Sequence, residues 1–146
     1  MSEKNNVFRV FVDSNILISA MLTDTSISRK LLLLLAEEHH LIICSYSITE
    51  VSRVLKKRFP NKLNEWDHFL SRLEFELAYT PLDFSTFPTP HIRDEKDIPI
   101  LVSALLAQPD IFISGDQDFH TPEIQEHLVV YTPAQFLKYF SDGENE

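Results

Sequence analysis

The acidic residues of this sequence include five whose positions could support chemistry. Asp13 and Asp116 each come at the end of an apolar run, "RVFV" and "IFISG", and Asp118 follows two residues later. Glu50 and Asp97 fall in the opening turns of two helical patterns. Carboxylates gathered at one place repel one another unless protons or cations compensate. A divalent cation is the obvious compensating group.

The type of ligand indicates which cation this would be. No Cys or His spacing accompanies the acids, and hard oxygen ligands favour Mg²⁺ or Mn²⁺ over zinc. Such ions polarise phosphoryl oxygens, help to deprotonate an attacking water and stabilise a leaving oxygen. A site of this kind would therefore suit hydrolysis of a phosphodiester bond.

Each acid also has an ordinary structural explanation, which for Asp13 is a helix cap and is the less favoured of its two interpretations. Glu50 is the third residue after Ser47, which is the spacing of an S-x-x-E capping box. Asp94 and Asp97 could simply favour the positive end of a helix dipole, and residues 116–118 could form a turn. These alternatives stay open from the residues alone.

Asp13 is followed by two further polar residues, Ser14 and Asn15. All three residue types cap helices, but a helix needs only one such cap. We therefore expect Ser14 or Asn15 to do the capping and Asp13 to remain free for a metal pocket.

Strand-like and helical patterns alternate along the chain. We predict strands over 7–12, 40–45, 110–116 and 128–133, a proline-rich loop over 80–97, and helices over 15–22, 28–40, 47–59, 63–77, 97–108, 122–128 and 133–140. This order predicts an α/β fold with a mainly parallel sheet of about four or five strands, covered by helices on both faces. In such folds the carboxyl ends of the strands face one crevice, where a polar residue after a strand becomes a site candidate.

Composition limits the remaining possibilities. At 146 residues, 44% of them hydrophobic, the chain suits a single domain over 1–146 with a polar tail at about 141–146. With one cysteine and no apolar stretch of signal-peptide or membrane-spanning length, we expect a cytoplasmic protein without a membrane association. Only two glycines are present, which excludes glycine-rich phosphate loops and dinucleotide-binding turns. The net charge of −9 argues against a broad nucleic-acid surface but permits local basic contacts.

Taken in order, the segments "VFVDSNILISAM", "SITEVSRVL", "RDEKDIPILVSAL", "IFISGDQDF" and "VVYTPAQFL" resemble PIN-domain ribonucleases. The resemblance is strongest to the VapC-like toxins of type II toxin-antitoxin modules. It implies a three-layer α/β/α fold and a Mg²⁺- or Mn²⁺-dependent endoribonuclease that cleaves single-stranded RNA. It also implies an antitoxin partner and a homodimer.

The same resemblance assigns roles to individual residues. Asp13, Glu50, Asp97 and Asp116 match the four metal-binding acids of the family; accessory roles fall to Ser14, Asn15, Asp94, Ser114 and Asp118. Asp94 is an alternative to Asp97 as the third acid, and Ser114 stands where the family more usually has Thr.

A basic segment and two competing functions complete the expectations. Arg53, Lys56 and Lys57 lie on the predicted helix of Glu50; they could contact an RNA backbone or form a solvated face that complements the helix dipole. One alternative is a catalytically quiet PIN-like domain that only binds RNA or a protein. The other is a receiver-type phosphoacceptor domain, which is disfavoured because a single Asp follows the first strand and no Lys follows the last.

Overall fold

The computed structural model describes residues 6–23 and 26–140 of the chain. The predicted polar tail at 141–146 lies outside these residues. The described elements are β1 (Arg9–Val12), α1 (Ser14–Leu22), α2 (Ile27–Glu38), β2 (His40–Cys44), α3 (Ser45–Arg58), η2 (Pro60–Lys62), α4 (Leu63–Arg72), β3 (Glu76–Ala78), η3 (Glu95–Asp97), α5 (Ile98–Ala107), β4 (Ile111–Ile113), η4 (Gln117–Phe119), α6 (Pro122–Gln125), β5 (Val130–Tyr131) and α7 (Pro133–Phe140), where η marks a 3₁₀ turn.

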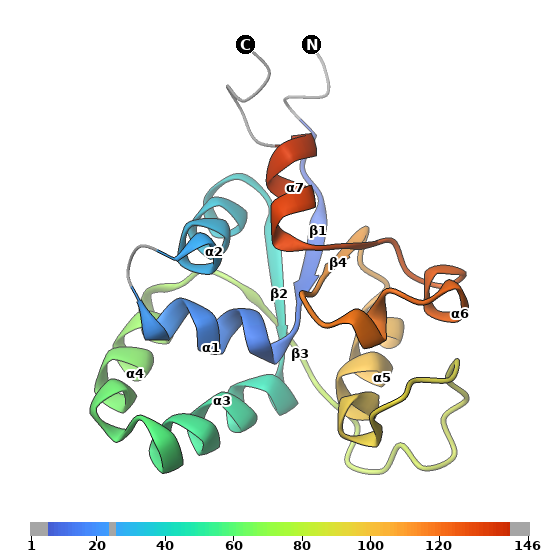
Figure 1. Ribbon diagram of the computed structural model, residues 1–146, viewed down its shortest axis with the longest axis horizontal. Helices are drawn as coiled ribbons and strands as arrows, with labels where there is room; N and C mark the ends of the chain where they lie inside the picture. Colours follow the sequence, from blue (N-terminus) through green and yellow to red (C-terminus); the bar gives the residue numbers. More distant parts are fainter. Residues whose placement is uncertain (1–5, 24–25, 141–146) are drawn as a thin grey trace.

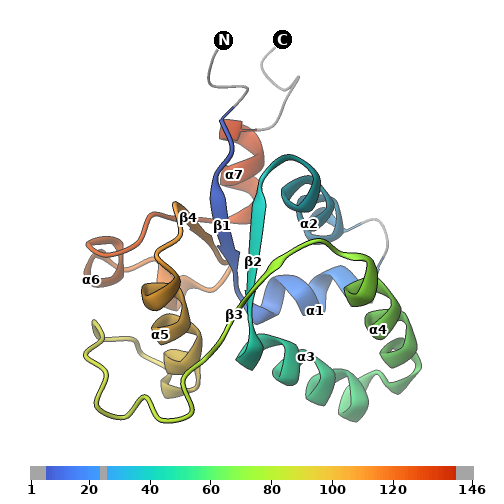
Figure 2. The same ribbon diagram turned by 180° about the vertical axis from the view of Figure 1, so that it is seen from behind.

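The strands form one sheet in which every pairing is parallel, in the order β3-β2-β1-β4-β5. Helices α1 to α4 lie on one side of this sheet and α5 and α6 on the other, as Figures 1 and 2 show from opposite sides. This arrangement is the predicted three-layer α/β/α fold with a parallel sheet.

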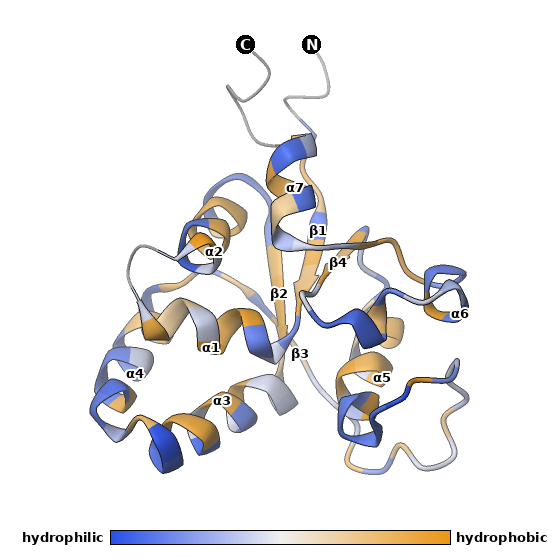
Figure 3. Ribbon diagram, viewed as in Figure 1, coloured by the Kyte–Doolittle hydropathy of each residue, from blue (hydrophilic) through white to orange (hydrophobic). Residues whose placement is uncertain are grey.

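Alternate residues of the central strands pack against the helices on opposite faces of the sheet. On β1, Val10 and Val12 pack into the cluster shared with α1, α2 and α4, whereas Phe11 packs into the cluster shared with α5. Strand β4 repeats the pattern, with Ile111 and Ile113 on the first side and Phe112 on the second. All of these side chains are nearly or fully inaccessible to solvent, so the middle strands are apolar on both faces. Figure 3 shows these strands mostly in orange, the colour of hydrophobic residues.

The helix predicted over 63–77 is wrong in its second half. Helix α4 ends at Arg72, and the chain then forms strand β3, which pairs with β2 through Ile42 and Glu76, Ile43 and Leu77. The apolar residues from Leu73 to Leu77 fit helical spacing and alternation equally well. Pairing with the otherwise open edge of β2 decides in favour of the strand.

The strand order also locates the sheet's crevice. The chain leaves β1 toward β2 and leaves β4 toward β5, so the connections diverge between the neighbouring strands β1 and β4. Open parallel sheets bind ligands beyond the carboxyl ends of the strands at such a switch point. Receiver domains have their switch point between β1 and β3 with the order 2-1-3-4-5, which is not the order here. The topology therefore excludes that alternative.

No helix in the described part of the chain is both long and apolar enough to span a membrane.

Candidate metal centre

Asp13 follows the last residue of β1 at the switch point, and Asp13 is 2% exposed. One carboxylate oxygen, Oδ1, accepts a hydrogen bond from the backbone N–H of Ile16 at 3.3 Å, and Oδ2 accepts one from the hydroxyl of Ser114. Asp13 is thus the N-cap of α1. The expectation that Ser14 or Asn15 would cap this helix is wrong. Ser14 is buried and donates to another hydroxyl, while Asn15 is exposed.

Ser114 joins the ends of β1 and β4. Its fully buried hydroxyl donates to Asp13 and accepts the backbone N–H of Asp116 at 2.9 Å. Its carbonyl oxygen accepts a hydrogen bond from His120 Nε2 at 2.7 Å, so this ring nitrogen carries a proton. The hydroxyl therefore fixes Asp13 and the backbone of Asp116 in one arrangement. Sequence reasoning singled out Ser114 but did not foresee the contact with His120.

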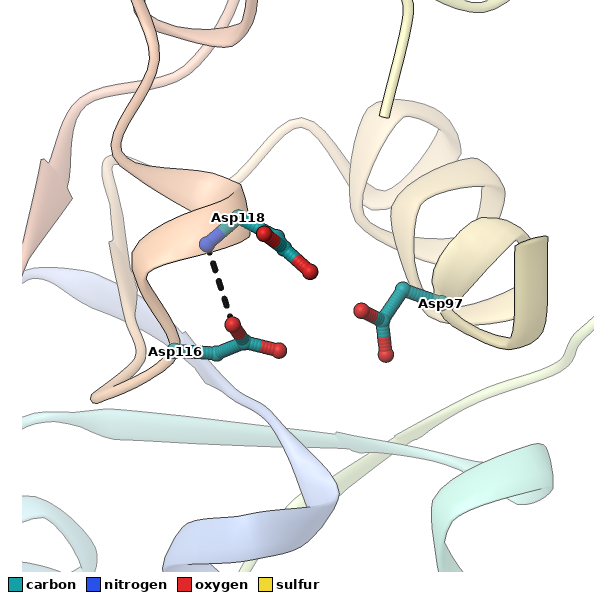
Figure 4. Close-up of side chains that lie close together, drawn as sticks. All are labelled: Asp97, Asp116 and Asp118. Atoms are coloured by element: carbon teal, nitrogen blue, oxygen red, sulfur yellow. Dashed lines mark hydrogen bonds between the residues drawn. The ribbon is translucent and has the colours of Figure 1, made fainter. Parts of the chain in front are cut away.

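Three carboxylates lie close together next to the hydrogen bonds of Ser114. One oxygen each from Asp97, Asp116 and Asp118 lies within 4.8 Å of the others. Figure 4 shows Asp97 on the turn before α5 facing the two acids of the β4–α6 connection. Asp116 also accepts the backbone N–H of Asp118 at 2.9 Å, which shapes the η4 turn. We refer to these three residues as the acidic trio.

The electrostatics of the acidic trio favour a bound cation. Burial raises the pKa of Asp97 from 3.8 to about 7, assisted by the nearby Asp116, Asp94 and Asp13 carboxylates. Burial also raises the pKa of Asp13 to about 6, partly offset by the Ser114 hydrogen bond. Oδ2 of Asp97 is buried without a hydrogen-bond partner among the described residues. An orphaned, buried carboxylate oxygen beside two further carboxylates fits a hard divalent cation such as Mg²⁺ or Mn²⁺.

The raised pKa values predict how the metal-free protein responds to pH. The unfolded chain releases these protons near pH 3.8, whereas folded Asp13 and Asp97 hold them to about pH 6 and 7. Their contribution to stability is therefore complete below pH 3.8 and is lost as the pH rises to about 7. Asp97→Asn removes the negative charge that causes part of this loss of stability at higher pH. In EDTA we expect the variant to melt roughly 3–6 °C above the wild type at about pH 8 and close to it at about pH 4.

Thermal melting at the two pH values measures this difference directly. A variant that melts below the wild type at the higher pH would contradict the proposed repulsion.

The capping-box explanation of Glu50 is wrong. Helix α3 begins at Ser45 with Cys44 at its N-cap position, so Ser47 already lies inside the first turn. Ser47 is fully buried, accepts a hydrogen bond from the hydroxyl of Ser14 at 2.9 Å and lies 3.3 Å from Cys44 Sγ. It is therefore part of the packing between α1, α3 and the end of β2.

Glu50 is not among the acids whose oxygens lie within 4.8 Å of one another. Its carboxylate is 3.8 Å from the guanidinium of Arg53, one turn further along α3. The charges of both Glu50 and Asp97 act on Tyr46, whose hydroxyl pKa is raised mainly by burial and then by these carboxylates. The hydroxyl of Tyr46 is therefore within electrostatic range of both acids, a neighbour that the sequence pattern did not identify.

Asp94 and Asp97 have different positions. The Asp94 side chain accepts the backbone N–H of Lys96 at 3.0 Å and so caps the η3 turn, whereas Asp97 joins the acidic trio. Of the two, Asp97 is therefore the one that lies with the other carboxylates.

The basic residues divide into near and far groups. Lys56 and Lys57 occupy the last turn of α3, exposed, and the helical rise places them about 9–11 Å further along the helix than Glu50. Arg93, which sequence reasoning missed, bonds Asp118 of the acidic trio at 2.9 Å. Its position in the proline-rich loop gave no periodic signal; only its adjacency to Asp94 could have drawn attention to it.

Comparisons with known proteins agree with this architecture. The fold is similar to that of a chain in the crystal structure of VapBC2 from Rickettsia felis bound to a DNA fragment from their promoter, with a TM-score of 0.63. The two chains are 17% identical, and the match covers 85% of this chain and 98% of that one. No curated protein matches the sequence. A sequence model of the PIN domain matches residues 9–118, which is most of the chain. The chain therefore belongs to the PIN-domain family.

Proposed function

We propose that this protein is a Mg²⁺- or Mn²⁺-dependent endoribonuclease that cleaves single-stranded RNA. The observation that carries the proposal is the buried, unpartnered oxygen of Asp97 in the acidic trio, at the switch point of a PIN-domain fold. Family membership and the sequence resemblance support the nuclease activity and the choice of RNA.

In this proposal Asp97 and Asp116 are the principal metal ligands. Asp118 completes the acidic trio. Asp13 positions the trio indirectly, because the Ser114 hydroxyl bonds both the Asp13 carboxylate and the backbone N–H of Asp116. When bound, the cation would supply Lewis-acid stabilisation of the negative charge that develops on the phosphoryl oxygens. Glu50, whose contact with Arg53 is long at 3.8 Å, is available as a further ligand or to orient the attacking water.

Other residues of the site serve to shape it. Ser14, buried against Ser47, fixes the start of α1 behind Asp13. Asp94 holds the η3 turn that carries Asp97. Asn15 is exposed at the same helix start, where it can meet substrate.

Incubation with end-labelled RNA tests the activity. The purified protein is expected to cleave a single-stranded RNA when Mg²⁺ or Mn²⁺ is present, to stop in excess EDTA, and to leave a duplex of the same sequence largely intact. Cleavage that persists in EDTA, or RNA that stays intact with either metal while the protein is folded, would refute the proposal.

The cellular role that we propose is the toxin of a toxin-antitoxin pair. The similar fold in the VapBC2 structure supports a protein partner for this chain, and the sequence resemblance adds a homodimer. Induced expression in growing bacteria is expected to arrest growth, and co-expression of the cognate antitoxin to relieve the arrest. A protein that cleaves RNA in vitro without slowing growth would instead be an RNA-processing nuclease.

A further inference from the structure

Arg93 connects the two chain segments that carry the acidic trio. It lies one residue before Asp94, the cap of the η3 turn that ends at Asp97. Its guanidinium reaches across to Asp118 on η4, 25 residues further along the chain. The contact therefore places a positive charge beside the carboxylates, from the loop that precedes η3.

The contact with Asp118 has a specific geometry. Arg93 Nε donates to Asp118 Oδ1 at 2.9 Å and Nη2 lies 2.9 Å from Oδ2, which makes a two-pronged pair. A guanidinium has five N–H groups, so the others remain, and they bond none of the described residues. The Arg93 side chain is 76% exposed, whereas that of Asp118 is 15% exposed. Asp118 thus holds a guanidinium whose free donors face solvent.

Charge explains what this guanidinium could bind. The chain carries a net charge of −9, and the acidic trio adds a local negative potential that repels a phosphate backbone. Asp118 holds the guanidinium along one edge and the Arg93 side chain is otherwise largely exposed, so the pair leaves it accessible to a ligand. Planar donors next to a phosphodiester-cleaving site match the oxygens of a phosphate group.

Arg53 is the other arginine near the site, and it is a weaker candidate. It touches Glu50 through a single 3.8 Å contact, and Glu50 is not a member of the acidic trio. Arg93 is held closer to the trio and by two bonds.

We propose that Arg93 binds a phosphate group of the RNA backbone at the edge of the acidic trio, with Asp118 positioning its guanidinium. This inference rests on the proposed function, because it names the part of the substrate that the site recognises. Because the contact is to the backbone, its contribution to affinity is the same for all RNA sequences.

Fluorescence anisotropy with a short, labelled single-stranded RNA tests the contact without requiring cleavage. Binding is measured in Ca²⁺ over a series of salt concentrations, and a gel confirms that the RNA stays intact. We expect Arg93→Gln to weaken binding about tenfold and to make the negative slope of log affinity against log salt shallower by about 0.7. Arg93→Lys keeps the charge but loses the planar set of guanidinium donors, so it is expected to weaken binding about threefold.

Arg58→Gln is the matched control, because Arg58 is exposed at the far end of α3. It is expected to bind RNA as the wild type does. Unchanged affinity and salt slope for Arg93→Gln, or an equal loss for Arg58→Gln, would overturn the inference. Thermal melting establishes that each variant is folded. If Arg93→Gln is not, Arg93→Lys decides by affinity alone, because it keeps the charge that sets the salt slope; binding equal to that of the wild type would then overturn the inference.

The wild type separates this inference from the proposed function. If it binds RNA but does not cleave it in Mg²⁺, the nuclease proposal fails and the binding data still decide the role of Arg93. If it cleaves RNA and Arg93→Gln binds equally well, only the inference fails. If it neither binds nor cleaves RNA, both fail.

Discussion

Replacing Asp116 by Asn is expected to lower Mg²⁺-dependent RNA cleavage about 1,000-fold, a loss of about 4 kcal/mol of transition-state stabilisation. The Asn side chain keeps the size of Asp116 and an oxygen that can accept the N–H of Asp118, so the η4 turn should survive. It removes one negative ligand from the acidic trio, and a neutral amide is a poor substitute toward a hard divalent cation.

Initial rates on a labelled single-stranded RNA over a range of Mg²⁺ concentrations measure this effect. Asp67→Asn, an exposed change of the same kind on α4, is the control and should cleave like the wild type. An Asp116→Asn enzyme that keeps most of its activity would remove Asp116 from the metal site.

Asp13 has two roles, and two substitutions should separate them. Asp13→Asn keeps an oxygen for the N–H of Ile16 but loses the charge, so we expect a folded protein with cleavage reduced about 100-fold or more. Asp13→Ala also removes the cap of α1 and leaves the buried Ser114 hydroxyl without its acceptor. Asp13→Ala should therefore also lower the free energy of unfolding by about 2–3 kcal/mol.

Urea unfolding and cleavage assays on both variants test this separation. If Asp13→Asn cleaves RNA at the wild-type rate, Asp13 is a helix cap alone. If Asp13→Ala is as stable as the wild type, the cap and the hydroxyl contact do not support the fold as described.

The sequence was sufficient to predict which end of the sheet holds the candidate site. Asp13 and Asp116 end apolar strands, and parallel strands present their carboxyl ends to one crevice, so their proximity follows from local pattern and general topology. Asp97 could be anticipated because it opens the following helix. The interaction that joins them, through the hydroxyl of Ser114, could not, because it depends on how two strands 101 residues apart are spaced.

Other features escaped prediction for identifiable reasons. The spacing of Leu73 and Leu77 fits both a helix and a strand, and only the open edge of β2 decides between them. Ser47 looks like a cap because the boundary of α3 lies two residues earlier than the pattern suggests. Arg93 lies in a loop without periodicity, so its contact with Asp118 depends entirely on tertiary structure.

The central claim is that the acidic trio holds a divalent cation. A crystal structure of the protein soaked with Mn²⁺, with anomalous diffraction to locate the ion, tests it most directly. We predict an anomalous peak in direct contact with carboxylate oxygens of Asp97 and Asp116, including the buried Oδ2 of Asp97 that lacks a partner among the described residues. A Mn²⁺ ion bound elsewhere, with the acidic trio empty under conditions in which the protein cleaves RNA, would contradict the account.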